Sequence, residues 1–219
     1  MQSVFPSITK FGMAALLPHK TLTVTDTMKV LCDGVSTDGT ENRDKILKGK
    51  NLKNCAVTYE ALLAMKQSQR RELVSGAEVV YIYHNIIDAV GDKANTENQV
   101  FEACADAMEE LKNLVRLVVN SMSGSNILIT ADHGFLYSYE PLAESEKIST
   151  SLVTGNVVET GRRYLFTDNA SKSDVLMSIS MEKYMKGLFG LTPCENIRIQ
   201  KQGGGSNFVH GGVSLQECC

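Results

Sequence analysis

The chain has 219 residues, a formal net charge of −3 and 43% apolar residues, which is the ordinary composition of a folded globular protein. It has no basic excess that would hold a nucleic-acid backbone by overall charge, and no apolar run is long enough to cross a membrane. The N-terminus lacks the organisation of a signal peptide, and the six cysteines are scattered without a CxxC pair. These features predict a cytoplasmic protein with reduced thiols.

The first part of the chain mixes helical and extended patterns. Residues 9–17 predict a short helix that ends before Pro18, because proline cannot donate a hydrogen bond into a helix. Alternating apolar and polar residues predict a hairpin over residues 22–31, and a turn-rich loop follows over 33–43. Residues 57–74 are amphipathic and predict a helix.

A strand–helix–strand unit is predicted next. Residues 79–83 form a β-branched and aromatic run, which is typical of a strand buried on both faces. Residues 96–99 fit a capping box, and apolar residues at three- and four-residue spacing then predict a long helix that ends near Gly124. Residues 126–130 predict a second buried strand. The expected fold class is therefore α/β, with a mainly parallel sheet and helices on both faces.

Beyond residue 140 the patterns predict a strand over 163–166, a helix over 173–188 and a glycine loop over 203–205. No internal repeat or linker divides the chain. We therefore expect residues 1–219 to form a single domain unit.

Polar residues follow both of the predicted buried strands. In open parallel sheets, ligands bind beyond the carboxyl ends of the strands, so side chains in these positions are expected to share one sheet edge. A later histidine precedes a glycine pair and adds another imidazole. The candidate metal ligands are Asp88, Asp92, Asp132, His133 and His210. Carboxylates combined with imidazoles suit zinc or manganese better than calcium.

Each of these residues also has a simpler interpretation. Asp88 fits a helix N-cap or a turn, and His210 fits an exposed loop histidine. His84 could join a metal, but a hydrogen bond at the strand end is the alternative. Arg162 and Arg163 fit either phosphate binding or structural pairing.

Thr9 lies at the start of the first predicted helix. Its hydroxyl would face unpaired backbone amides at the positive end of the helix dipole, which is a ready site for a phosphate. A plain N-cap threonine is the alternative interpretation.

Five longer motifs resemble the PglZ family, a component of BREX phage-defence systems within the alkaline phosphatase superfamily. They are PSITKFGMAALLPH (6–19), YIYHNIIDAVGD (81–92), ILITADHGFLY (127–137), GRRYLF (161–166) and NFVHGGVSLQE (207–217). The motifs cover nearly the whole chain in the order of the family. The resemblance implies an alkaline phosphatase-like domain.

The resemblance also implies roles for the candidate residues. The superfamily uses two divalent metals, commonly zinc, and a Ser or Thr nucleophile for phosphoryl transfer. Thr9 matches the nucleophile, and Asp132 with His133 matches the pair that binds the metal beside it. Asp88 and His210 match ligands of the other metal, and Asp92 stands where much of the superfamily has histidine. A carboxylate at that position favours harder ions such as manganese or magnesium.

One further ligand of the superfamily, an upstream aspartate, has no candidate, because only eight residues precede Thr9. We therefore expect the sequence to be a partial domain that lacks its first strand and its C-terminal end, with an impaired nucleophile-side metal site.

Two functions follow from the resemblance. The first is a metal-dependent phosphohydrolase, of phosphodiesterase or nuclease type, that acts on nucleic acid or another phosphoester in phage defence. The second is a non-catalytic platform that docks a DNA methyltransferase and other BREX proteins. The presence of five candidate ligands and a nucleophile favours the first, because a platform tolerates their loss.

Overall fold

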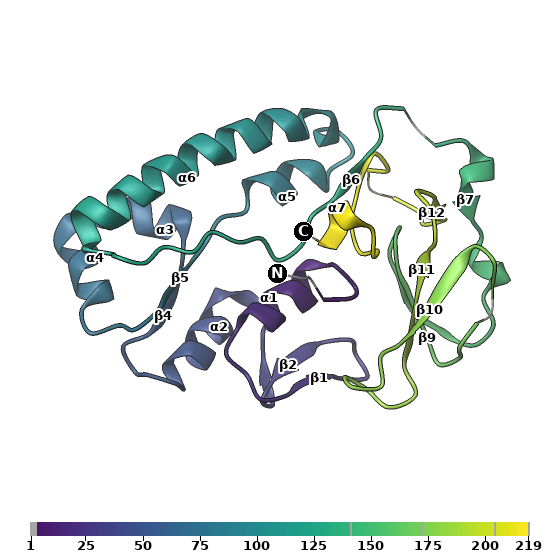
Figure 1. Cartoon of the computed structure of the whole chain (residues 1–219), viewed down its shortest axis with the longest axis horizontal. Coiled ribbons are helices and arrows are strands. Elements are labelled where there is room, and N and C mark those ends of the chain that lie inside the picture. Colours follow the sequence, from purple (N-terminus) through teal and green to yellow (C-terminus); the bar gives the residue numbers. More distant parts are fainter. Residues whose placement is uncertain (1–3, 141, 172, 204, 219) are drawn as a thin grey trace.

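The computed structural model describes residues 4–140, 142–171, 173–203 and 205–218. Its helices are α1 (Thr9–Leu16), α2 (Gly39–Lys48), α3 (Tyr59–Ala64), α4 (Gln67–Val74), α5 (Ile86–Gly91), α6 (Val100–Met122) and α7 (Leu215–Cys218). Short 3₁₀ turns are η1 (Glu97–Gln99), η2 (Glu144–Glu146) and η3 (Thr150–Leu152). In Figure 1, α6 runs along one side of the molecule and most of the later strands lie at the opposite end.

The described strands are short. They are β1 (Leu22–Val24), β2 (Val30–Cys32), β3 (Val35–Ser36), β4 (Cys55–Thr58), β5 (Val80–Tyr83), β6 (Leu136–Tyr137), β7 (Lys147–Ile148), β8 (Val157–Thr160), β9 (Leu165–Thr167), β10 (Leu176–Ser180), β11 (Phe189–Pro193), β12 (Arg198–Ile199) and β13 (Phe208–Val209). β4 and β5 pair in parallel, as do β7 and β12. The largest described sheet has the order β10-β11-β9-β8 and is antiparallel.

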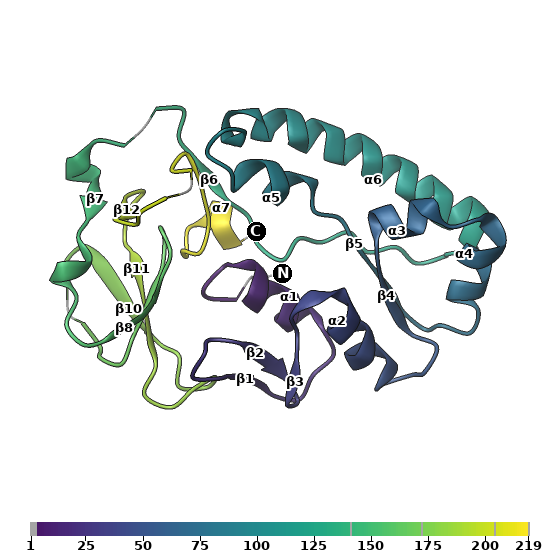
Figure 2. The same cartoon turned by 180° about the vertical axis from the view of Figure 1, so that it is seen from behind.

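The α/β class is confirmed, but the prediction of a mainly parallel sheet is not. Most of the described pairings are antiparallel, and the later strands form the separate region seen in both Figure 1 and Figure 2. The predicted helix over 173–188 is wrong, since this segment contains β10 followed by turns. β10 pairs along its whole length with β11, and this pairing overrides the local helical pattern.

The predicted buried strand over 126–130 is also wrong. This segment is extended but unassigned to any described sheet, and Leu128 is 76% exposed. Consequently the parallel partner of β5 is β4, which precedes it, and not the segment after α6. An apolar run therefore identified an extended segment but not its burial, because burial depends on what packs against it.

Several local predictions are confirmed with adjusted bounds. The first helix and the hairpin correspond to α1 and to the antiparallel pair β1/β2. The predicted helix over 57–74 begins later and divides into α3 and α4, and α2 replaces part of the loop predicted over 33–43. The capping box at 96–99 is wrong, because the Thr96 hydroxyl donates to the Val90 carbonyl instead. The glycine loop over 203–205 includes a residue outside the described ranges.

The main core joins α1 to the antiparallel region. Phe11, which is fully buried, contacts the rings of Phe166 and Tyr184 with centroids 5.9 and 5.5 Å away. Burying such a ring contributes roughly 1.5–3 kcal/mol. A second cluster packs α6 onto β4 and β5 through Leu62, Leu114 and other apolar side chains. Because α1 is fixed by this core, the residue at its first position has a defined location.

Candidate metal and phosphoryl-transfer site

Thr9 is the first residue of α1, but it does not cap the helix. The N-cap is Ile8, and no side chain caps this end. The Thr9 hydroxyl instead lies 3.1 Å from Nε2 of His133. The interpretation of Thr9 as an N-cap residue is therefore wrong, and its hydroxyl is available for contacts outside the helix.

His133 is held in one orientation by the backbone next to it. Its Nδ1 lies 3.0 Å from the Gly134 carbonyl oxygen, which can only accept a hydrogen bond, so Nδ1 carries the proton. In the neutral imidazole, Nε2 is then an acceptor. This nitrogen lies 3.5 Å from Asp88 Oδ2 and 3.6 Å from Asp132 Oδ2.

Asp88, Asp132 and His133 thus form a three-residue cluster. One ligand atom from each lies within 4.8 Å of the others. Burial raises the pKa of Asp88, although electrostatic interaction with the neighbouring imidazoles opposes the effect. Two carboxylate oxygens and an imidazole nitrogen that converge in this way are repulsive unless a cation or a proton lies between them. Their chemistry fits a divalent ion such as zinc or manganese.

The local sequence explains how these three residues meet. β5 ends just before α5, and Asp88 lies in the first turn of this helix. Asp132 packs against α1 at Gly12, where a Cβ would lie 2.3 Å from the Asp132 carbonyl oxygen. Only glycine allows α1 to approach the Asp132 backbone so closely.

His210 and Asp92 extend the cluster on one side. The imidazole of His210 stacks on that of His133, with centroids 4.2 Å apart and planes 13° from parallel. Its Nε2 lies 3.4 Å from Asp92 Oδ1. Burial lowers the pKa of His210, but the hydrogen bond to Asp92 and the charges of Asp88 and Asp92 raise it overall. The same hydrogen bond lowers the pKa of Asp92.

All six predicted site residues therefore lie in one region. The grouping differs from the expected one, because the sequence assigned Asp88 to a site with Asp92 and His210. In the structure Asp88 shares its cluster with Asp132 and His133. Asp88 Oδ2 lies 3.5 Å from His133 Nε2, and Asp92 at the C-cap of α5 lies 3.4 Å from His210 Nε2.

A groove of 590 Å³ opens beside this region. Its lining includes Thr9, Asp92 and His210 together with Glu159, Arg162 and Lys201. Lys10 also lines it, and the Lys10 ammonium lies 2.6 Å from the Glu159 carboxylate. Cationic side chains in the lining suit an anionic ligand.

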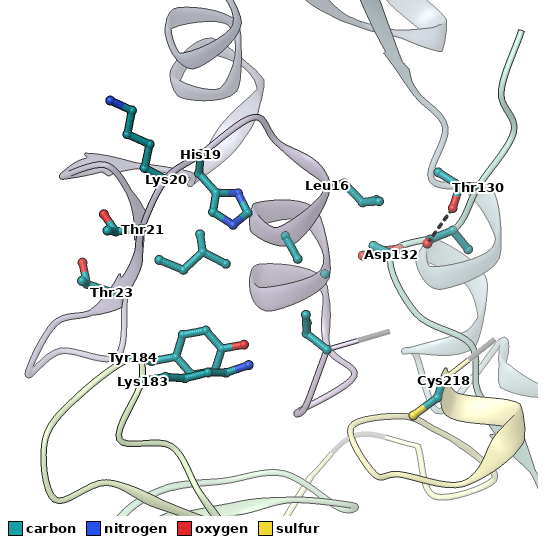
Figure 3. A pocket seen from close by; sticks show the side chains of 15 residues that line it. Leu16, His19, Lys20, Thr21, Thr23, Thr130, Asp132, Lys183, Tyr184 and Cys218 are labelled. Atoms are coloured by element: carbon teal, nitrogen blue, oxygen red, sulfur yellow. Dashed lines mark hydrogen bonds between the residues drawn. The ribbon is translucent and has the colours of Figure 1, made fainter. Parts of the chain in front are cut away.

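A second cavity of 660 Å³ lies beside α1 and is shown in Figure 3. Thr130 and Asp132 line one side of it, and Thr21 and Tyr184 line another. Among the described residues, its lining contains neither Thr9 nor the two stacked histidines. The groove is therefore better placed for a substrate of Thr9.

The other polar residues considered from the sequence have structural contacts. His84 Nε2 lies 2.5 Å from the Glu110 carboxylate, in agreement with the hydrogen-bonded interpretation. Arg163 is buried and forms an ion pair with Glu217, which is the structural alternative. Arg162 donates to the Gly203 carbonyl oxygen at the groove.

Sequence reasoning missed Ser7 and Glu217, both of which are fully buried next to the site. Ser7 lies two residues before Thr9, and Glu217 follows His210 by seven residues. A polar residue so close to a candidate nucleophile was a usable signal for Ser7. No sequence signal identified Glu217, because its partners lie far away in the chain.

Within the described ranges, no helix combines the length and apolar character needed to cross a membrane.

The whole chain, residues 1–219, matches the model of a family described as the BREX system PglZ alkaline phosphatase-like domain. The chain is 38% identical over 220 residues to the alkaline phosphatase-like protein PglZ of Bacillus cereus (strain H3081.97), covering 99% of this chain and 26% of that protein. It is 39% identical over 224 residues to the alkaline phosphatase-like protein BrxZ of Escherichia coli O9:H4 (strain HS), covering 99% of this chain and 25% of that protein. The chain thus spans about a quarter of the length of the curated relatives it matches.

Proposed function

Because this chain belongs to the PglZ family of BREX alkaline phosphatase-like domains, we propose that it is the phosphoryl-transfer domain of a metal-dependent phosphodiesterase in phage defence. The observation that carries the proposal is the contact between the Thr9 hydroxyl and His133, at a cluster with two carboxylates. A hydroxyl at the end of a helix that does not cap the helix is available to attack phosphorus.

In the proposed reaction, Thr9 is the nucleophile. The bond from Thr9 Oγ1 to phosphorus forms as the bond from phosphorus to the leaving oxygen breaks, and that oxygen takes up the proton released by the hydroxyl. Water then breaks the bond between phosphorus and Thr9, which restores the hydroxyl and releases a phosphate monoester. The fixed position of α1 keeps Oγ1 beside the cluster in both steps.

Asp88, Asp132 and His133 would hold one divalent ion, and Asp92 and His210 would contribute to a second. Bound divalent ions neutralise phosphoryl oxygens and lower the pKa of a coordinated hydroxyl. The roles of the protein side chains are to supply the ligands and to orient them. Zinc is the expected metal, and the carboxylate of Asp92 favours manganese or magnesium as alternatives.

The groove supports a diester substrate, since Thr9, Arg162 and Lys201 all line it. The second substituent of a phosphodiester would lie in this groove near Arg162 and Lys201, whose positive charges favour a nucleic-acid backbone or another anionic group. Other BREX proteins are the proposed partners, because the matching family is described as a BREX system domain, and the family resemblance adds a DNA methyltransferase to this proposal.

The test is hydrolysis of bis(4-nitrophenyl) phosphate by the full-length protein loaded with Zn²⁺ or Mn²⁺. Thr9→Ala should reduce the rate by about 10³-fold or more while metal content stays unchanged, because loss of a nucleophile removes the reaction path. Thr9→Ser should retain activity, since serine supplies the same oxygen. Asp132→Ala should lose both metal and activity.

Thr37→Ala is the matched control. Thr37 is a buried threonine, whereas Thr9 is half-buried, and the Thr37 hydroxyl donates to the Val30 carbonyl oxygen. This variant should keep both metal and activity. Full activity in Thr9→Ala would contradict the covalent route, and no hydrolysis by the metal-loaded wild type would favour the non-catalytic platform.

A further inference from the structure

Ser7 connects the segment that carries Thr9 to the loop that carries His210. Its side chain is fully buried. The Ser7 hydroxyl donates to the Gly212 carbonyl oxygen over 2.8 Å and accepts from the Gly211 amide over 3.1 Å. Both hydrogen-bonding capacities of one hydroxyl are thus used on the loop of residues 210–212, called here the His210 loop.

The Ser7 backbone orients the histidine itself. Nδ1 of His210 lies 3.3 Å from the Ser7 carbonyl oxygen. A carbonyl oxygen only accepts, so Nδ1 carries the proton and Nε2 is directed toward Asp92. His133 has the same arrangement, with Nδ1 on the Gly134 carbonyl oxygen. A histidine whose Nδ1 is fixed in this way presents Nε2 to a metal.

The two glycines of the loop make this close approach possible. Gly211 has φ +113°, and a Cβ there would lie 2.5 Å from the Tyr164 ring. A Cβ on Gly212 would lie 2.4 Å from the Glu217 carboxylate. A side chain at either position would therefore push the loop away from Ser7.

Glu217 fixes the other side of the same loop. Its Oε1 accepts from the Gly212 amide over 2.8 Å, and its backbone oxygen accepts from the Gly134 amide over 3.0 Å. Gly134 directly follows His133, so one residue of α7 contacts the loops of both histidines. In Figure 1, α7 lies between α1 and β6, which is the arrangement that these bonds require.

We infer that Ser7 is a positioning residue for the candidate metal site, because its hydroxyl and carbonyl hold His210 in the metal-binding orientation and in register with Thr9. The inference rests on the proposed function, since it assigns His210 to a metal. The Ser7 bridge, meaning the three hydrogen bonds between Ser7 and the His210 loop, links the nucleophile to the outer ligand. Through Gly212 and Glu217, the link continues to His133.

The experiment measures Zn²⁺ affinity of the full-length protein by competition with a chelator, together with the melting temperature of the metal-free protein. Ser7→Ala should weaken Zn²⁺ binding by about tenfold, the lower end of the cost of losing a partner that orients a ligand, because the Ser7 carbonyl that contacts His210 Nδ1 remains. Ser7→Thr keeps the hydroxyl and should restore most of the affinity.

Ser171→Ala is the matched control. Ser171 is also buried, and its hydroxyl contacts Thr154 in the antiparallel region. This variant should lower the melting temperature about as much as Ser7→Ala but leave Zn²⁺ affinity unchanged. Equal Zn²⁺ affinity in Ser7→Ala and the wild type would overturn the inference and reduce Ser7 to a structural role.

A measurement on the wild type keeps the test independent of whether Ser7→Ala folds. The ¹⁵N spectrum of neutral His210 in the metal-free protein should show the tautomer with the proton on Nδ1, and the other tautomer would overturn the inference. Failure of the proposed function has a different signature. It would appear as wild-type protein that binds Zn²⁺ but hydrolyses no phosphodiester, while the affinity difference at Ser7 persists.

Discussion

The loops that carry His133 and His210 orient their imidazoles in the same way but lie in different surroundings. In both, a backbone carbonyl fixes Nδ1 and leaves Nε2 facing a carboxylate. The His133 side chain is 2% exposed and its partners Asp88 and Asp132 are 22% and 13% exposed. Asp92, the partner of His210, is 58% exposed and lines the groove.

The orientation of each imidazole and the enclosure of its carboxylate partner therefore have separate causes. The hydrogen bond to Nδ1 fixes the direction of each imidazole, whereas the surrounding helices and loops set how far the carboxylates are exposed to water. An enclosed carboxylate interacts strongly with a neighbouring charge, and an exposed one is screened by water. The His133 side of the site should therefore dominate metal affinity, and the His210 side should be more accessible to substrate.

The largest expected effect comes from Glu217, which contacts both loops. Glu217→Gln would leave the buried guanidinium of Arg163 without its counter-charge, and breaking such a pair costs about 3–5 kcal/mol. Urea unfolding at neutral pH measures this loss. A loss no larger than that of an ordinary surface substitution would contradict the stabilising role of the buried pair between Glu217 and Arg163.

The pH dependence of that loss has a definite sign. Burial raises the pKa of Glu217, but the hydrogen bonds and charge of Arg163 lower it below its usual value. The stabilisation is therefore fully present above the pKa of the unfolded chain, roughly 4.3, and is lost as the pH falls through the folded-state pKa. The difference in unfolding free energy between wild type and Glu217→Gln should shrink below about pH 4.

The next effect compares the two carboxylates directly. Asp88→Asn should lower Zn²⁺ affinity by about 100-fold or more, and Asp92→Asn by about tenfold or less, since Asp92 is more exposed. Both substitutions remove one charge at constant volume, so each controls for the other. Equal losses in a chelator competition would remove the distinction between the enclosed and the open side.

Gly12→Ala should affect the His133 side alone. Its new Cβ would lie 2.3 Å from the Asp132 carbonyl oxygen, so α1 or Asp132 must move. We expect a loss of unfolding free energy of about 2 kcal/mol and weaker metal binding. A crystal structure of the variant with Asp132 and His133 in their original positions would contradict this prediction.

The smallest effect is expected where neither loop is involved. Thr58 caps α3 by accepting a hydrogen bond from the Ala61 amide. Thr58→Ala should cost about 1 kcal/mol in thermal or urea unfolding and leave Zn²⁺ affinity unchanged. Any change in affinity would mean that loss of stability by itself disturbs the site, and would weaken the interpretation of the other variants.

Local sequence features predicted the parts of the molecule that depend on neighbouring residues. Pro18 follows soon after the end of α1, and the alternation around Thr25 corresponds to the β1/β2 hairpin. The apolar spacing after Thr96 corresponds to α6, which packs on β4 and β5. The five candidate ligands and Thr9 were named from motifs, and the structure gathers them in one region.

The motifs did not predict which segments are buried or which side chains meet, because both depend on tertiary packing. Residues 126–130 have a strand-like sequence, yet they are exposed and outside the described sheets, because burial is a property of what packs against a segment. The contacts of Asp88 with His133 and of Asp92 with His210 join segments far apart in the chain, and the order of these residues in the sequence does not predict them.

The residue types in the motifs therefore indicate which chemistry is available: a hydroxyl, carboxylates and imidazoles in motifs that resemble one family. Which of these side chains meet depends on the folded chain. Ser7 and Gly212 are separated by 205 positions in the chain, and Arg163 and Glu217 by 54. Contacts over such separations depend on long-range packing, which local patterns do not encode, so the residues that orient the site became visible only in the folded chain.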